Sequence, residues 1–169
     1  MTHARRHSVL LTFLILLCMA TGAAVGGGLY EGVVLTPSWS AAPPQSFAII
    51  QPDTGVPLQA FWMPVHAVIT LTVLLALGFG WRDPTLRRCL LLGLAAYIAM
   101  RAWSFAYFIP EMLSFQDVPL SQPPTPELSE RVARWTTLTW LRLPLDLLAA
   151  TSFLVGFRYV GWRRPDVGT

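Results

Sequence analysis

Four long runs of apolar residues, separated by polar or proline-rich segments, set the pattern of this sequence. The runs cover about residues 8–35, 60–80, 89–109 and 135–160. A helix needs about 20 mostly apolar residues to cross a bilayer, and each run is long enough. Backbone in lipid must satisfy its own hydrogen bonds, and the runs lack the alternation of a barrel strand. The pattern therefore predicts four transmembrane helices.

The composition supports a membrane protein. Hydrophobic residues make up 54% of the 169 residues and charged residues 12%, about half the charged fraction that is usual in soluble domains. Such a chain is too apolar to be disordered and carries too little charge for the surface of a soluble domain. Two cysteines exclude a disulfide scaffold. We predict an all-α integral membrane four-helix bundle that forms a single domain over residues 1–169.

The arginines predict how the bundle is oriented. Eight arginines flank the spans on one side: Arg5, Arg6, Arg82, Arg87, Arg88, Arg158, Arg163 and Arg164. The opposite loops carry only Arg131 and Arg134. By the positive-inside rule, both termini are cytoplasmic and the two longer loops, about 36–59 and 110–134, face outward. Because the arginines form no single patch, the net charge of +3 does not indicate nucleic-acid binding. The expected location is the plasma (bacterial inner) membrane.

The first apolar run also resembles a signal peptide, because basic residues precede it and small residues follow at 20–24. The run continues past these small residues to Leu35, so we expect an uncleaved first span. Its glycines are spaced four apart: Gly22 and Gly26, and Gly28 and Gly32. Small residues at this spacing allow close packing of helix backbones, either within the bundle or in a homo-oligomer. They also allow a kink near Gly26–Gly28.

Prolines near the outer ends of the spans predict where helices end or bend. Pro37 and Pro110 are expected to end their helices, because proline lacks the N–H that continues the hydrogen-bond ladder. Pro144 lies deeper in span four, where it should free the carbonyl of Trp140 and kink the helix. A freed carbonyl in a membrane must be satisfied by protein or by cavity water. The sequence therefore predicts a polar interior near Trp140.

Five ionisable side chains lie inside the predicted spans: Glu31, His66, Arg101, Arg142 and Asp146. Charges in a membrane are costly and usually face the bundle interior or a water-filled cavity. With a helical rise of 1.5 Å per residue, all five fall in the outer half. Arg142 and Asp146 are four residues apart and can pair, and Glu31 can pair with Arg101 between spans. We expect the five to converge into one charge-balanced centre.

This centre has a functional and a structural interpretation. The functional one is an outward-opening pocket whose ligand-binding residues are Asp146 and the aromatic residues Trp62, Trp103, Tyr107 and Trp140. The structural one is a buried ion network that fixes the helix register, with the aromatic residues forming an interfacial belt.

The sequence predicts no cofactor and no metal. It has no phosphate-binding or dinucleotide-binding motif and no nucleophile elbow. His66 is the only histidine in a span, which excludes bis-histidine haem within one chain. His66 could hold a metal ion together with Glu31 and Glu111. The favoured role of His66 is to donate hydrogen bonds or carry a proton.

Four short strings carry a resemblance to a known family: Gly28-Leu29-Tyr30-Glu31 followed by Pro37, Phe61-Trp62-x-Pro64-x-His66, Arg101 followed by Tyr107-Phe108-x-Pro110, and Thr139-Trp140-Leu141-Arg142. Together they resemble the anthrone-oxygenase-like family of small four-helix membrane proteins, over nearly the whole chain. The family pattern has an Asn before Trp-x-Arg in span four, where this sequence has Thr139.

The resemblance implies cofactor-independent oxidation of an electron-rich phenolic or quinone-like aromatic molecule. Such a reaction needs a base to form a carbanion or phenolate, and a cation to stabilise it. In this sequence the candidate bases are His66 and Glu31, and the candidate charge stabilisers are Arg101 and Arg142.

We therefore expect a small polytopic membrane protein that binds a hydrophobic or quinone-like small molecule in a buried polar and aromatic site. Cofactor-independent oxygenase activity is what the resemblance adds, and the residues alone do not decide whether a reaction occurs. The alternative is a non-enzymatic accessory or assembly subunit of a membrane complex. The expected partners are the lipid bilayer, the small-molecule ligand and a second copy of the chain through the span-one glycines.

Overall fold

The computed structural model describes residues 3–162, so Arg163 and Arg164 of the orientation argument lie outside the described residues. The described chain is all-α. Its elements are α1 (His3–Tyr30), η1 (Glu31–Leu35), α2 (Thr36–Ser40), η2 (Gln45–Ile50), α3 (Leu58–Gly80), α4 (Pro84–Trp103), η3 (Ser104–Phe108), α5 (Ile109–Gln116), α6 (Pro126–Trp140) and α7 (Leu143–Trp162). Among them η1 and η3 are π-helical turns, and η2 is a 3₁₀ helix.

These elements join into four rods that are long and apolar enough to cross a membrane. The rods cover Ala4–Ser40, Leu58–Gly80, Pro84–Gln116 and Pro126–Trp162. They contain the four predicted spans, and three of them extend further at the end of the bundle away from the termini. The four-helix prediction is therefore confirmed for the described chain.

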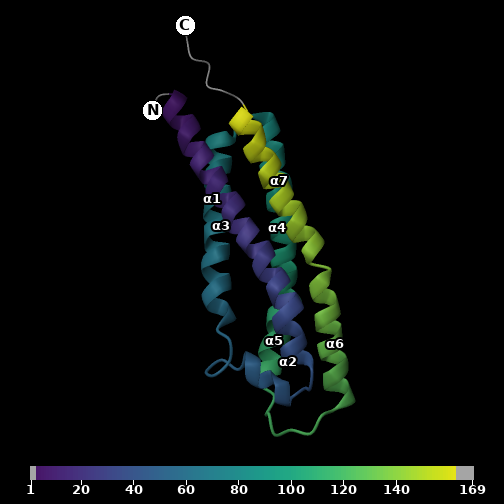
Figure 1. The fold of residues 1–169 in the computed structure, drawn as a ribbon. Helices are drawn as coiled ribbons and strands as arrows, with labels where there is room; N and C mark the ends of the chain where they lie inside the picture. Colours follow the sequence, from purple (N-terminus) through teal and green to yellow (C-terminus); the bar gives the residue numbers. More distant parts are fainter. Residues whose placement is uncertain (1–2, 163–169) are drawn as a thin grey trace.

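The bundle has two halves with different packing (Figure 1). We call the half that holds both described chain ends the terminal half and the other the distal half. In the terminal half, α1 packs along α3 and α7, and α4 packs along α7. The core there is mostly aliphatic, and it includes Leu14, Leu17 and Leu90. Because lipid is as apolar as these side chains, close van der Waals packing holds this half together.

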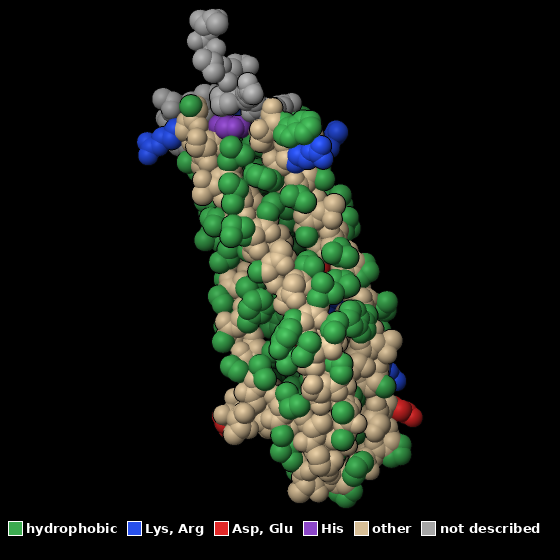
Figure 2. Space-filling model, viewed as in Figure 1, with side chains coloured by type: hydrophobic (Ala, Val, Ile, Leu, Met, Phe, Trp, Pro, Cys, Tyr) green, Lys and Arg blue, Asp and Glu red, His purple; other side chains and the backbone are tan. Residues whose placement is uncertain are grey.

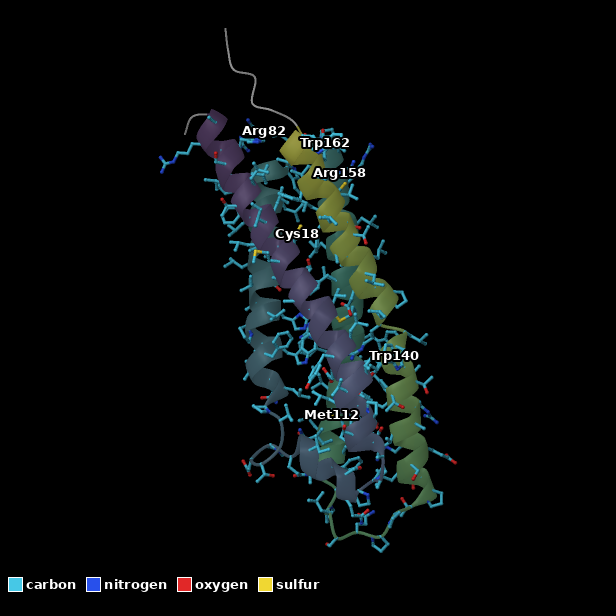
Figure 3. The ribbon with its side chains drawn as sticks, viewed as in Figure 1. Cys18, Arg82, Met112, Trp140, Arg158 and Trp162 are labelled. Carbon is cyan, nitrogen blue, oxygen red and sulfur yellow. The ribbon has the colours of Figure 1, made fainter. Side chains whose placement is uncertain are left out.

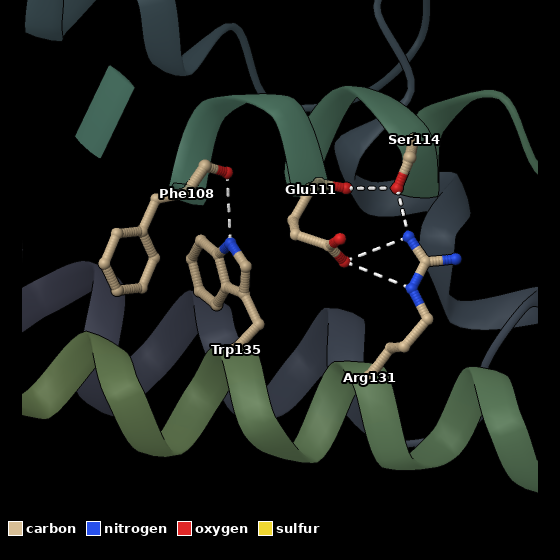
Figure 4. Close-up of polar contacts among 5 residues, drawn as sticks. All are labelled: Phe108, Glu111, Ser114, Arg131 and Trp135. Atoms are coloured by element: carbon tan, nitrogen blue, oxygen red, sulfur yellow. Dashed lines mark hydrogen bonds and ion pairs between the residues drawn. The ribbon is translucent and has the colours of Figure 1, made fainter. Parts of the chain in front are cut away.

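The distal half is held by an aromatic core, which we call the distal aromatic cluster: Trp39, Phe47, Phe108, Phe115 and Trp135, with aliphatic neighbours. Most of its rings meet edge to face or tilted, as in the Trp39–Trp135 pair with centroids 5.2 Å apart, and Phe47 stacks on Phe115. Figure 4 shows the polar contacts beside it: Trp135 Nε1 donates to the carbonyl of Phe108 at 3.1 Å.

A clamp of polar side chains joins α5 to α6 in the same region (Figure 4). Arg131 forms an ion pair with Glu111 at 2.9 Å and donates to Ser114 Oγ at 2.6 Å. Glu111 is therefore paired with Arg131 at the rim of the bundle and does not form a metal site with His66 and Glu31.

The prediction that Pro37 and Pro110 end their helices is wrong, because the rods continue to Ser40 and Gln116. A π-helical turn precedes each proline. In η1 the N–H of Thr36 donates to the carbonyl of Glu31, and in η3 the N–H of Ile109 donates to the carbonyl of Ser104. The wider i→i+5 turn replaces the regular ladder just before the proline, where the missing N–H and the ring would disturb an α-helix.

The interruption predicted in span four is confirmed. α6 ends at Trp140, residues 141–142 form a turn, and α7 begins at Leu143, with Pro144 in its first turn. Span one differs from the expectation, since α1 runs without a break through Gly26–Gly28 and changes geometry only at Glu31.

Arginine side chains gather at the terminal end of the visible face, and apolar side chains cover much of the length of the bundle (Figure 2). Arg82 and Arg158 lie at this end, as does Trp162 (Figure 3). The predicted cytoplasmic location of the termini depends on this gathering of arginines at one end of the bundle.

Candidate functional site

A cluster of charged side chains lies inside the bundle near the point where the rods change geometry. Arg142 interacts electrostatically with Glu31, Asp146 and Arg101, and His66 interacts with both arginines. The structure thus brings together all five ionisable residues that the sequence placed in one centre. We call Glu31, His66, Arg101, Arg142 and Asp146 the charged cluster.

Glu31 and His66 are positioned by Trp62 of α3. Trp62 Nε1 donates to Glu31 Oε2 at 2.9 Å, which is a short distance for a hydrogen bond to a carboxylate. The Trp62 ring also stacks on the His66 ring, with centroids 5.5 Å apart and an interplanar angle of 18°. Glu31 is the first residue of η1, so the π-helical turn is where this carboxylate enters the cluster.

A hydrogen-bonded chain runs from His66 across to α4. The hydroxyl of Tyr97 lies 3.2 Å from His66 Nδ1 and 3.3 Å from Thr70 Oγ1. The described chain supplies this partner to Nδ1 and none to Nε2. His66 therefore has one nitrogen fixed by protein and one that a ligand can use.

Arg142 lies at the break between α6 and α7, and its side chain reaches η3. Its Nη1 donates to Ser104 Oγ at 3.2 Å, and its Cζ lies 4.0 Å from the centre of the Phe108 ring. Ser104 opens η3 as Glu31 opens η1, so both π-helical turns begin at a residue whose side chain faces this cluster or contacts it. π-helical turns occur frequently at functional sites.

The charges of the cluster are close without being paired. Within residues 3–162, the one ion pair is between Arg131 and Glu111, so the expected direct pairs of Arg142 with Asp146 and of Glu31 with Arg101 do not form. Arg101 packs its guanidinium over Phe105 at 4.5 Å. The described chain gives neither Arg101 nor Asp146 a side-chain hydrogen bond, so both keep their hydrogen-bonding capacity.

The aromatic candidates divide between three places. Trp62 contacts two residues of the charged cluster, Glu31 and His66. Trp103 and Tyr107 pack against Phe108 of the distal aromatic cluster, with centroids 5.4 and 5.1 Å away. Trp140 lies beside the break in span four (Figure 3) and is 41% exposed. Its ring covers Gly32, where a Cβ would lie 3.1 Å from the indole.

Sequence reasoning missed two residues of the site, Tyr97 and Ser104. Helical spacing is the signal that identifies them, since Tyr97 is one turn before Arg101 and Ser104 is three residues after it. Residues at these spacings share a helix face.

A second group of polar atoms, next to the cluster, is buried without a hydrogen-bond partner in the described chain: Thr36 Oγ1, Trp39 Nε1, Thr139 Oγ1 and Arg142 Nε. Both threonines lie where α2 meets α6, between the Trp39–Trp135 contact and the Gly32–Trp140 contact. Their neighbours Ser38 and Thr137 donate to the carbonyl one turn earlier.

We expect Thr36→Val to stabilise the protein by about 1 kcal/mol, because it removes a buried hydroxyl that no group satisfies and keeps the side-chain shape. Thermal unfolding in detergent, followed by circular dichroism, measures the effect. Thr137→Val is the control, because its hydroxyl is exposed and bonded; its change should stay within about 0.5 kcal/mol. A loss of stability in Thr36→Val would contradict the prediction and show that the hydroxyl has a partner.

Two surface hollows lie elsewhere on the described chain. One, of about 420 Å³, is lined by Arg6 and by α3 residues in the terminal half. The other, of about 500 Å³, is lined by residues 48–49 and 54–57. Neither touches the charged cluster. Within residues 3–162 no group of three His, Cys, Asp or Glu side chains could hold a metal ion, so His66, Glu31 and Glu111 do not form the metal site that the sequence left open.

No protein-family model, curated protein or solved structure matches this chain. The resemblance to the anthrone-oxygenase-like family stays a prediction.

Proposed function

We propose that the protein binds a flat, amphipathic small molecule of the quinone or phenol class in the charged cluster. The observation that supports this most is the unpaired state of Arg101 and Asp146, which no hydrogen bond of the described chain satisfies. Charged groups within a membrane are costly unless they find partners. A ligand with polar oxygens on an apolar ring would supply those partners.

The arrangement of groups favours such a ligand. Arg101 offers N–H donors to a carbonyl or phenolate oxygen, and Asp146 offers acceptors to a hydroxyl. Two acids and two arginines sum to zero, so the cluster suits a neutral molecule. The stacked Trp62 and His66 rings supply an aromatic wall, as small-molecule sites commonly do.

If the ligand is phenolic, His66 is the better candidate base. Glu31 already accepts a hydrogen bond from Trp62, whereas Nε2 of His66 is unused by the described chain. A proton taken by His66 has a hydrogen-bonded neighbour in Tyr97, and Arg101 or Arg142 would stabilise the phenolate electrostatically. These are the roles that the family resemblance implies for the same residues.

The alternative is a non-enzymatic accessory or assembly subunit in which the charged cluster only fixes the fold. The observation that favours it is that the two hollows described above lie away from the cluster. A ligand-binding measurement distinguishes the two functions.

The test is binding of a short-chain ubiquinone analogue to the full-length protein in lipid nanodiscs, followed by tryptophan fluorescence. We expect Arg101→Gln to weaken binding at least about tenfold. A hydrogen bond to a charged group contributes about 1.5–3 kcal/mol, and each 1.4 kcal/mol changes Kd tenfold. Arg101 holds no hydrogen bond within the described chain, but its loss leaves Glu31 and Asp146 with Arg142 alone, so circular dichroism of Arg101→Gln checks the fold before binding is measured. Arg134→Gln, an exposed arginine of α6, is the control and should bind as the wild type does.

Two results would contradict the proposal. Wild-type protein that binds neither the quinone nor a phenolic analogue would favour the accessory-subunit function. Equal binding by Arg101→Gln and wild type would place the ligand outside the charged cluster.

We further infer that the termini face the cytoplasm of a bacterial inner membrane, which the arginines gathered at the terminal end support (Figure 2). A homo-oligomer through span one is supported by Gly22 and Gly26, because a Cβ at either glycine would meet no atom within 4 Å. Gly27 and Gly32, in contrast, pack against Phe61 and Trp140 inside the chain.

A further inference from the structure

The hollow in the terminal half has the shape of a groove along α3. It is lined by Leu74, Leu75, Gly78 and Phe79 of α3 and by Arg6 of α1, and its volume is about 420 Å³. Leu74 and Gly78 are four residues apart, as are Leu75 and Phe79, so each pair follows the helix axis. The groove therefore follows the last two turns of α3, at the end of the bundle that holds the termini.

Gly78 keeps the groove open. A Cβ at this position would meet no atom within 4 Å, so a larger side chain would fit there without disturbing the bundle. Leu74 is exposed beside it. The apolar part of the groove thus has no partner within the described chain.

Arg6 places a fixed positive charge at the other end of the groove. Its Nη2 donates to the carbonyl of Phe79 at 3.0 Å, close to the C-terminal end of α3, where helix carbonyls lack internal partners. This bond holds the guanidinium in place and leaves other N–H donors for a ligand. An apolar groove that ends in a held cation matches a molecule with an anionic head and an apolar tail.

The charge around the groove supports an anionic head. Arg5 and Arg82 lie at the same end of the bundle and are exposed. Asp83, the acid at this end of the described chain, is engaged by the backbone N–H groups of Thr85 and Leu86. Clusters of arginine at the membrane surface attract anionic lipids.

We propose that this groove binds an anionic phospholipid, with its phosphate against Arg6 and one acyl chain along Leu74 and Gly78. The site is separate from the charged cluster and does not depend on the function proposed for it. The lipid fills the space beside Gly78 and neutralises Arg6 at the surface.

Native mass spectrometry of the full-length protein, with phosphatidylglycerol or phosphatidylcholine of equal chain length added to the detergent, tests the proposal. The wild type should retain phosphatidylglycerol preferentially. Arg6→Gln should weaken this binding about fivefold, the factor expected for losing one arginine near an anionic surface. Gly78→Leu should weaken binding of both lipids because it fills the groove.

Matched controls separate the groove from general effects. Arg5→Gln removes the same charge one residue away, outside the groove lining, and should weaken phosphatidylglycerol binding clearly less than Arg6→Gln does. Gly161→Leu enlarges another open glycine, on α7, and should retain phosphatidylglycerol as the wild type does. Arg6→Gln also removes a bond to α3, and should it fail to fold, Gly78→Leu decides the question alone. Equal binding by Gly78→Leu and the wild type, no preference between the two lipids, equal losses in Arg5→Gln and Arg6→Gln, or displacement of the lipid by inorganic phosphate would each overturn the proposal.

Discussion

Gly93→Val should destabilise the protein by about 3 kcal/mol, the upper end of the usual cost of overpacking a core. Gly93 lies on α4 where it packs against α7, and a Cβ there would lie 2.4 Å from the Phe153 ring. Phe153 is completely buried, so its ring has no free space to move into. Either the two helices separate or the ring adopts a strained position. Unfolding in a denaturing detergent, followed by circular dichroism, measures the loss.

Gly78→Val is the control for this substitution. It introduces the same β-branched residue into a neighbouring helix, at a glycine whose added Cβ would meet nothing within 4 Å. Its stability should stay close to that of the wild type. If both variants lose the same stability, the loss does not come from the contact with Phe153 and the packing argument for Gly93 is wrong.

Arg142→Leu should cost about 3 kcal/mol, because removing one partner from a set of buried charges leaves the others uncompensated. Arg142 interacts electrostatically with Glu31 and Asp146, and its guanidinium also donates to Ser104 and covers the Phe108 ring. After the substitution, Glu31 and Asp146 are left with one arginine of the cluster, Arg101. The same unfolding assay measures the effect.

A double variant separates charge from packing. Arg142→Leu combined with Asp146→Leu restores a neutral cluster, so it should recover part of the stability lost in the single variant. Arg131→Leu is the control, because its pair with Glu111 is partly exposed and should contribute less than about 1 kcal/mol. A double variant less stable than Arg142→Leu alone would show that the charges of the cluster do not compensate one another.

The convergence of the charged residues was predictable because depth along a helix depends only on residue count. Glu31, His66 and Arg101 come from three rods, yet their distances from the span ends already placed them at one level. The cost of charge in lipid then requires that they face inward and toward one another. The helical spans were predictable for a similar reason, because the number of residues in each apolar run is read directly from the sequence.

The directions of the aromatic side chains and the effect of the prolines on the helices were not predictable in the same way. Each residue turns an α-helix by about 100°, so the extra residue of a π-helical turn rotates every later side chain about the rod. Tyr107 lies within η3, and its direction does not follow from α-helical spacing to Arg101. The sequence shows Pro37 and Pro110, but it does not show that a wide turn lets the rod continue past them.

The direct ion pairs failed because the two arginines make other contacts. Arg142 and Asp146 are one helical turn apart, and the N–H of Asp146 donates to the carbonyl of Arg142, so the spacing itself allows a pair. The guanidinium of Arg142 instead reaches Ser104 and Phe108 of η3, and that of Arg101 lies over the Phe105 ring. Which of several partners a long side chain contacts does not follow from spacing along one helix.

Because of the two π-helical turns, a single rod packs into two cores of different composition. One extra residue shifts the angular phase between the segments on either side, so the stripe that faces inward before the turn differs from the stripe that faces inward after it. In the rods that contain Glu31 and Ser104, an aliphatic seam gives way to an aromatic and charged one with no loop between them. Apolar helix contacts and the charged and aromatic side chains thereby lie along one continuous helical rod.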